Sequence, residues 1–71
     1  MAEARFVVRG LEDEEAAEKV EATLFSKVGV QEVKADWEKG EIWIRYDERT
    51  VPQPRLRSYL QGAGVSVIRP A

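Results

Sequence analysis

Four short stretches of the chain have the pattern of β-strands, and in the second and third of them apolar and polar residues alternate with the period of two that is typical of strands. The four stretches are residues 5–9, 30–37, 41–46 and 65–68. In the third stretch Ile42, Ile44 and Tyr46 share one face, and Trp43 lies on the other. Glu38–Gly40 separates the second and third stretches and predicts a hairpin turn between antiparallel strands.

Two intervening stretches have the spacing of amphipathic helices. The first, Leu11–Val28, has its apolar positions at Ala16, Ala17, Val20, Leu24 and Val28. Asp13 is a suitable N-cap, because its side chain can accept a backbone hydrogen bond of the first turn. Lys27 lies in the predicted last turn, and Gly29 ends the helix. A second helix is predicted from about Pro54 to Gly64, with its apolar stripe at Leu56, Tyr59, Leu60 and Ala63.

The order strand–helix–strand–strand–helix–strand predicts an α+β fold, a ferredoxin-like βαββαβ open-faced sandwich. Right-handed crossovers place both helices on one face of a four-stranded antiparallel sheet with the spatial order 4-1-3-2. The helix-covered face is predicted to carry Phe6, Val8, Val33, Ala35, Trp37, Ile42, Ile44 and Val67. We expect residues 1–71 to form a single domain whose second sheet face is open to water.

The composition excludes several kinds of chemistry. The 71 residues contain no cysteine and no histidine, which removes disulfides, thiolate metal ligands, a cysteine nucleophile and the usual general base. We therefore expect no enzymatic activity and no cofactor. No apolar run approaches the ~20 residues of a membrane span, so a cytoplasmic location is expected. The net charge of −2 is not typical of a dedicated nucleic-acid binder.

Several segments, taken in order and at their spacing, resemble a known family. They are Phe6–Leu11, Val20–Leu24, Gly29–Val30, Val33–Asp36, Gly40–Asp47 and Leu56–Val65. Together they are similar to the heavy-metal-associated (HMA) domain of copper chaperones and of the N-terminal modules of metal-transporting ATPases. The resemblance runs from about Phe6 to Val67 and implies the same ferredoxin-like fold.

The HMA family binds a soft ion such as Cu(I) through two thiolates in a Gly-Met-x-Cys-x-x-Cys loop. The matching residues are Gly10–Ala16, with Asp13 in place of the first cysteine and Ala16 in place of the second. Ala16 has no donor atom, and soft ions select thiolate over a carboxylate oxygen. The resemblance therefore implies the scaffold without its soft-metal ligands.

The acidic residues of this loop leave two interpretations open. Glu12, Asp13 and Glu15 are weak candidates for binding a hard cation such as Ca²⁺, Mg²⁺ or Mn²⁺ through oxygen atoms. They also lead straight into a helix, which splays their side chains around its axis and favours a role at the helix dipole.

Two surfaces are candidates for partner binding. Glu14, Glu18 and Glu21 are predicted on the outer side of the first helix, where they either steer a basic partner or form a solvated face. The open sheet face is predicted to carry the second set, which is Arg5, Arg9, Trp43 and Arg45. That face is either structural, with arginine stems covering Trp43, or a protein interface, or a platform for single-stranded nucleic acid.

These observations lead to one main hypothesis and two alternatives. The main hypothesis is a small non-catalytic HMA-like domain that acts as a protein-interaction or regulatory module related to heavy-metal transport and chaperone proteins. The alternatives are weak direct metal binding or an accessory role in metal handling, and single-stranded nucleic-acid binding on the open sheet face. We expect a protein partner, such as a metal transporter or chaperone, rather than a membrane or a nucleic acid, and a monomer or weak homodimer.

Overall fold

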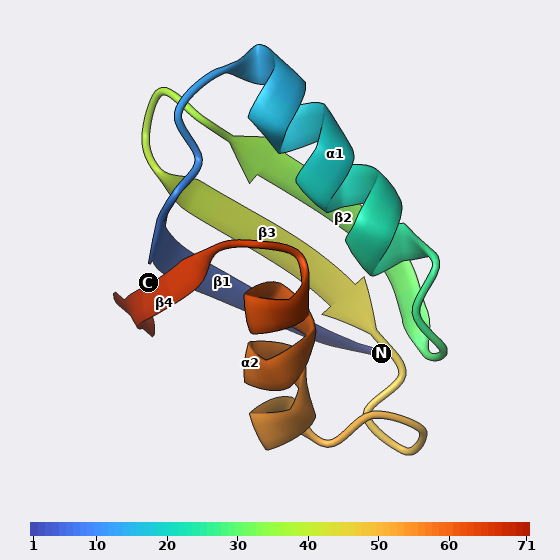
Figure 1. Ribbon diagram of the computed structural model, residues 1–71. Helices are drawn as coiled ribbons and strands as arrows, with labels where there is room; N and C mark the ends of the chain where they lie inside the picture. The colour runs from blue at the N-terminus through green and yellow to red at the C-terminus, as the bar shows by residue number, and fades with distance from the viewer.

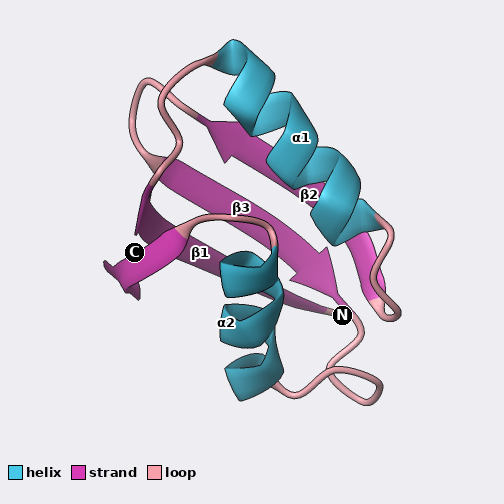
Figure 2. Cartoon of the chain, in the orientation of Figure 1, coloured by secondary structure: helices cyan, strands magenta, loops and turns pink.

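The structure, a computed structural model that describes residues 1–71, consists of a four-stranded sheet and two helices (Figure 1). The elements are β1 (Ala2–Arg9), α1 (Glu14–Phe25), β2 (Val30–Asp36), β3 (Glu41–Tyr46), α2 (Gln53–Gly62) and β4 (Ser66–Pro70). The strands are antiparallel and lie in the order β2-β3-β1-β4. Both helices cover the same face of the sheet, with α1 beside β2 (Figure 2). The predicted ferredoxin-like sandwich and its strand order are confirmed.

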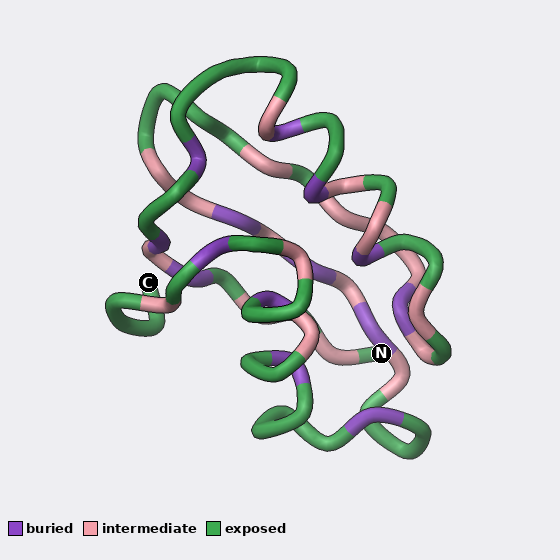
Figure 3. The backbone as a smooth tube through the Cα atoms, in the orientation of Figure 1, coloured by how far each residue is buried: buried purple, intermediate pink, exposed green.

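The core lies between the sheet and the two helices, and both helices contribute to it (Figure 3). Its buried residues are Phe6, Val8, Leu11, Ala17, Val20, Leu24, Val30, Ile42, Ile44, Tyr46, Val51, Leu56, Leu60 and Val65. The predicted alternation of β3 is confirmed, because Ile42, Ile44 and Tyr46 are buried while Trp43 faces the other side of the sheet. Neither helix is long and apolar enough to cross a membrane.

Helix α1 begins as predicted but ends earlier. Ser26 is its C-cap, and the chain then tightens into a turn in which Lys27 N–H donates to Leu24 O at 3.0 Å. The prediction that Lys27 lies in the last turn and that Val28 belongs to the apolar stripe was wrong, because Val28 is 72% exposed. The turn must reverse the chain so that Val30, rather than Val28, enters the core.

Strand β2 is also shorter than predicted. It ends at Asp36, whose Oδ1 accepts hydrogen bonds from the backbone N–H groups of Glu38 and Lys39 at 3.1 and 3.2 Å. Trp37 therefore lies in the hairpin turn, 41% exposed, and its predicted place on the helix-covered face was wrong. Val33 and Ala35 are only half-buried, because β2 is an edge strand and α1 covers it from one side.

Candidate functional site

The loop between β1 and α1 uses its acidic residues to hold the helix. Asp13 is the N-cap, and its Oδ1 accepts a hydrogen bond from Ala16 N at 2.8 Å. Glu15 forms an ion pair with Lys19 at 3.4 Å, one turn further along α1. Glu12 is exposed, and no three Asp, Glu, His or Cys side chains converge in a way that could hold a metal ion. The geometry favours the helix-dipole interpretation of this acidic run.

The acidic residues of α1 differ in how far their side chains are exposed to solvent. Glu14 and Glu18 are exposed, as predicted. Glu21 is half-buried, and its Oε2 accepts a hydrogen bond from Ala35 N of β2 at 2.8 Å. Its predicted place on the outer side of the helix was wrong, because the helical turn carries its carboxylate toward the edge of the sheet.

A groove of about 360 Å³ lies between α1 and β2. It is lined by Glu18, Glu21, Ala22, Phe25, Glu32 and Val33. None of these six side chains is cationic, and Phe25 is 61% exposed. We call this surface the α1–β2 groove.

Phe25 was missed as a site residue because it lies outside the apolar stripe that predicts the core. Counting along α1, it follows Glu14, Glu18 and Glu21 at helical spacing, and so extends their stripe. A large apolar residue that continues an acidic stripe is a signal that the sequence contained. What the stripe could not show is that β2 lies beside it.

The open sheet face carries three cross-strand rows of side chains. Lys34, Trp43 and Arg5 form the central row, since Trp43 is the register partner of both of the other residues. One flanking row contains Glu32, Arg45 and Glu3, and the other contains Asp36, Glu41 and Val7. Arg9 pairs with Ser66 of β4 and lies beyond these rows.

Several charged side chains on this face have partners within the chain. The indole Nε1 of Trp43 donates to Glu3 Oε1 at 2.9 Å, and Arg45 donates to Glu32 at 2.8 Å. The cation over the Trp43 ring is Lys34, whose Nζ lies 5.8 Å from the ring centroid. The structural interpretation of this face had arginine stems covering Trp43, but the cation over the ring comes from β2, although both Arg5 and Lys34 are register partners of Trp43.

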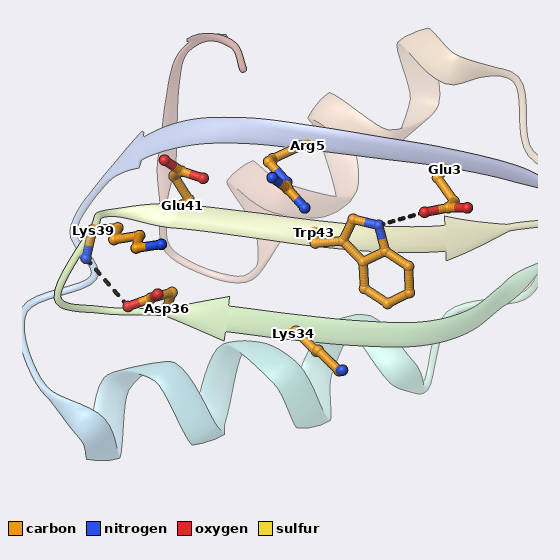
Figure 4. Close-up of a pocket in the computed structure, with 7 residues that line it drawn as sticks. All are labelled: Glu3, Arg5, Lys34, Asp36, Lys39, Glu41 and Trp43. Carbon is orange, nitrogen blue, oxygen red and sulfur yellow. Dashed lines mark hydrogen bonds between the residues drawn. The ribbon is translucent and has the colours of Figure 1, made fainter.

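A hollow of about 380 Å³ lies over this central row (Figure 4). It is lined by Glu3, Arg5, Lys34, Asp36, Lys39, Glu41 and Trp43, which are three acids, three cations and the tryptophan. Glu3 was not predicted as a site residue, because β1 begins at Ala2, earlier than the predicted start at residue 5. Phosphate-rich polymers need a surplus of cations, so the mixed charge of this hollow favours a structural or protein-contact role.

Asp47, which lies outside both surfaces, has a carboxyl group whose pKa is lowered. The backbone N–H of Arg49 donates to Asp47 and lowers the pKa of that carboxyl, and the Thr50 hydroxyl and Arg49 side chain act in the same direction. Asp47 also orders the start of the connection between β3 and α2 through its backbone, because its carbonyl oxygen accepts hydrogen bonds from Thr50 N and Val51 N.

Comparison with known proteins gives matches among solved structures alone. Neither a family model nor a curated protein sequence matches the chain. The CopZ metallochaperone has a TM-score of 0.86 at 21% identity, over 94% of this chain and all of that one (100%). A copper-binding domain from HMA7, a P-type ATPase, has a TM-score of 0.88 at 18% identity, over 99% of this chain and 97% of that one. The N-terminal domain of PacS from Synechocystis PCC6803 has a TM-score of 0.82 at 15% identity, over 100% of this chain and 98% of that one.

At these identities the likeness concerns the backbone and its topology. The neighbours match over nearly their whole length, and the strand order and the two-helix layer are those predicted from the resemblance. The chain, which contains no cysteine, therefore has the ferredoxin-like fold of HMA domains such as the CopZ metallochaperone and the copper-binding domain of the P-type ATPase HMA7.

Proposed function

We propose that this chain is a non-catalytic protein-interaction module, built on the scaffold of a copper chaperone, that binds a basic surface of its partner through α1. The α1–β2 groove carries this proposal, because it combines exposed apolar area at Phe25 with a lining that contains carboxylates and no cation. Aromatic residues are enriched at the centres of protein interfaces, and polar residues form the rim around them.

The loop between β1 and α1 supports an interaction role over metal carriage. Its one acidic residue at a family ligand position, Asp13, already accepts the Ala16 N–H as the helix N-cap. Binding a metal there would cost that hydrogen bond, and the carboxylate is a poor ligand for a soft ion. Ala16 offers no second ligand.

The neighbours suggest a class of partner. CopZ is a metallochaperone and HMA7 is a P-type ATPase, so a chaperone or transporter of metal ions with a basic docking surface is the partner that we propose. Residues 12–21 contain six acids and one lysine, a density of negative charge that accelerates encounter with a cationic surface. The association rate should then fall as the salt concentration rises.

Site-specific photo-crosslinking in cells of the source organism tests this proposal. A photoreactive amino acid at position 18 should crosslink to a defined partner, while the same amino acid at position 48, an exposed acidic site outside the groove, should not. The purified partner should then bind the unmodified chain, and Glu18→Lys should weaken binding by at least about tenfold. The matched control Glu48→Lys makes the same charge change and should leave the affinity unchanged.

Two results would contradict the proposal. One is a partner that binds Glu18→Lys and Glu48→Lys equally well. The other is saturation of the Gly10–Ala17 amide resonances by one equivalent of Cu(I) under reducing conditions, which would make the chain a metal carrier.

A further inference from the structure

The outer edge of β2 has backbone groups that no strand pairs. Ala35 N–H donates to the Glu21 carboxylate rather than to β3, so the backbone groups of Ala35 point away from the sheet. In an antiparallel ladder this direction alternates along the strand, so the N–H and C=O of Val33 also point outward. The free edge therefore presents Val33 N–H, Val33 C=O and Ala35 C=O.

This free edge borders the α1–β2 groove. Val33 belongs to both, since it lines the groove together with Ala22 and Phe25. Side chains of an added strand would alternate, and every second one would lie on the α1 side, over the groove. These side chains would meet the apolar floor near Phe25 and the carboxylates of Glu18 and Glu21.

We propose that an extended basic segment of a partner protein adds to the outer edge of β2 as a fifth strand and places its side chains in the α1–β2 groove. This inference rests on the proposed interaction function and names its binding mode. Backbone pairing at Val33 supplies affinity, and the groove selects the sequence. Charge complementarity identifies the occupant, because no cation lines the groove and two of its three glutamates, Glu18 and Glu21, form no ion pair, whereas Glu32 pairs with Arg45.

The dimensions of α1 define the pattern that the segment should have. Glu18 and Phe25 are seven residues apart, which is about 10 Å along a helix. Residues on the same side of a strand are about 7 Å apart for each step of two. The segment should therefore carry a Lys or Arg and an apolar side chain separated by two or four residues.

A second copy of this chain is a poor occupant of the same edge. Symmetric pairing of two β2 strands would make each groove face its copy, because a two-fold interface uses the same patch on both subunits. The glutamates of both copies would then approach one another, and like charges brought together this way oppose association.

Selection from a displayed library of random peptides about a dozen residues long, with the whole chain as bait, tests the inference. Enriched peptides should alternate Lys or Arg with β-branched or aromatic residues. A synthetic enriched peptide should shift the Val33 and Ala35 amide resonances and slow hydrogen exchange at Val33 N–H. Methylating the peptide backbone nitrogens that face β2 should abolish binding, whereas methylating the alternate nitrogens should not.

Two matched pairs of variants separate the groove from its surroundings. Phe25→Ala should weaken peptide binding by at least about tenfold, while Val28→Ala, an exposed apolar residue outside the groove lining, should not. Glu18→Gln should weaken it by about threefold to tenfold, while Glu48→Gln should have no effect. All four side chains are exposed, so folding is checked by circular dichroism and expected to persist.

The outcomes distinguish this inference from the proposed function. Enriched peptides that bind as helices, that tolerate either pattern of backbone methylation, or that bind the open sheet face would overturn strand addition while the interaction function stands. A library without enrichment would overturn strand addition as well, and the crosslinking result at position 18 would then decide the interaction function by itself.

Discussion

The α1–β2 groove and the hollow over Trp43 are similar in size, about 360 and 380 Å³, but their charges are arranged differently. The lining of the hollow balances three acids with three cations. No cation lines the groove, and of its three glutamates only Glu32 forms an ion pair, with Arg45 and Lys34. Where a surface carries both signs, its opposite charges offset one another. Where it carries an excess of negative charge, that excess attracts a basic surface of another molecule.

The two surfaces also use their aromatic residues differently. The Trp43 ring is held by a hydrogen bond to Glu3 and lies beside the Lys34 ammonium group. Phe25 is 61% exposed and packs outside the core. We infer that Trp43 contributes mainly to the stability of the sheet and Phe25 mainly to recognition, and the first two of four predictions test this difference.

The largest effect on stability is expected in the core at Leu24, the residue that precedes Phe25 in α1. This side chain is fully buried, so Leu24→Ala should lower the free energy of unfolding by about 2–5 kcal/mol. Its neighbour in α1 is the control, and Phe25→Ala should change the free energy by less than about 0.5 kcal/mol. Chemical denaturation measures both values. Equal losses at the two positions would show that Phe25 is a structural residue and would remove the aromatic anchor from the groove.

A smaller loss is expected at Trp43. Trp43→Ala removes a side-chain hydrogen bond, a cation–π contact and cross-strand packing, which together contribute about 1–3 kcal/mol. Trp37 in the hairpin turn is the matched control, and Trp37→Ala should stay within about 0.5 kcal/mol of the unaltered chain. Thermal unfolding followed by circular dichroism measures the difference. If Trp43→Ala left the free energy of unfolding unchanged, Trp43 would not be a stabilising residue, and the open sheet face would become the candidate for partner binding.

A third prediction concerns the acidic end of α1, where charge serves structure. Asp13→Ala removes the N-cap hydrogen bond to Ala16 N and should cost about 0.5–2 kcal/mol. Asp13→Asn keeps an oxygen that can accept this bond and should restore most of the loss. Urea denaturation distinguishes the two variants. If Asp13→Asn were as unstable as Asp13→Ala, the carboxylate charge rather than the cap would be the stabilising feature.

The smallest effect is expected at Asp47, which lies outside both surfaces. Because hydrogen bonding lowers its pKa in the folded chain, the ionised form stabilises the fold. This contribution is complete above the ordinary aspartate pKa and is lost as the pH falls through the lowered folded value. The stability gap between the unaltered chain and Asp47→Asn should therefore be constant from neutral to mildly acidic pH and close at lower pH. A gap that persists in acid would mean that packing, rather than ionisation, is involved.

Local patterns predicted much of the fold. The alternation of β3, the Asp13 cap and the hairpin at Gly40, where φ is +66°, each depend on residues close together in the chain. The strand order followed from these elements because right-handed crossovers leave few arrangements. The ends of elements were less predictable: Trp37 and Val28 continue an apolar pattern but lie in turns that reverse the chain.

The candidate site was predicted less completely, for a physical reason. The carboxylate of Glu21 faces β2, and Lys34 rather than an arginine lies over Trp43, because α1 and the strands meet at positions distant in sequence. A helical stripe shows which side chains share a face. It does not show which strand, register or edge that face meets.

The sequence by itself determined the order of the elements, the faces of the strands and the absence of thiol and imidazole ligands, because these follow from residue identity and short-range periodicity. Only the tertiary structure decided that the acidic stripe of α1 ends on the free edge of β2 with Phe25 exposed between them. Pairing between distant segments sets that juxtaposition, since the register of a strand fixes which side chains and backbone groups remain without partners.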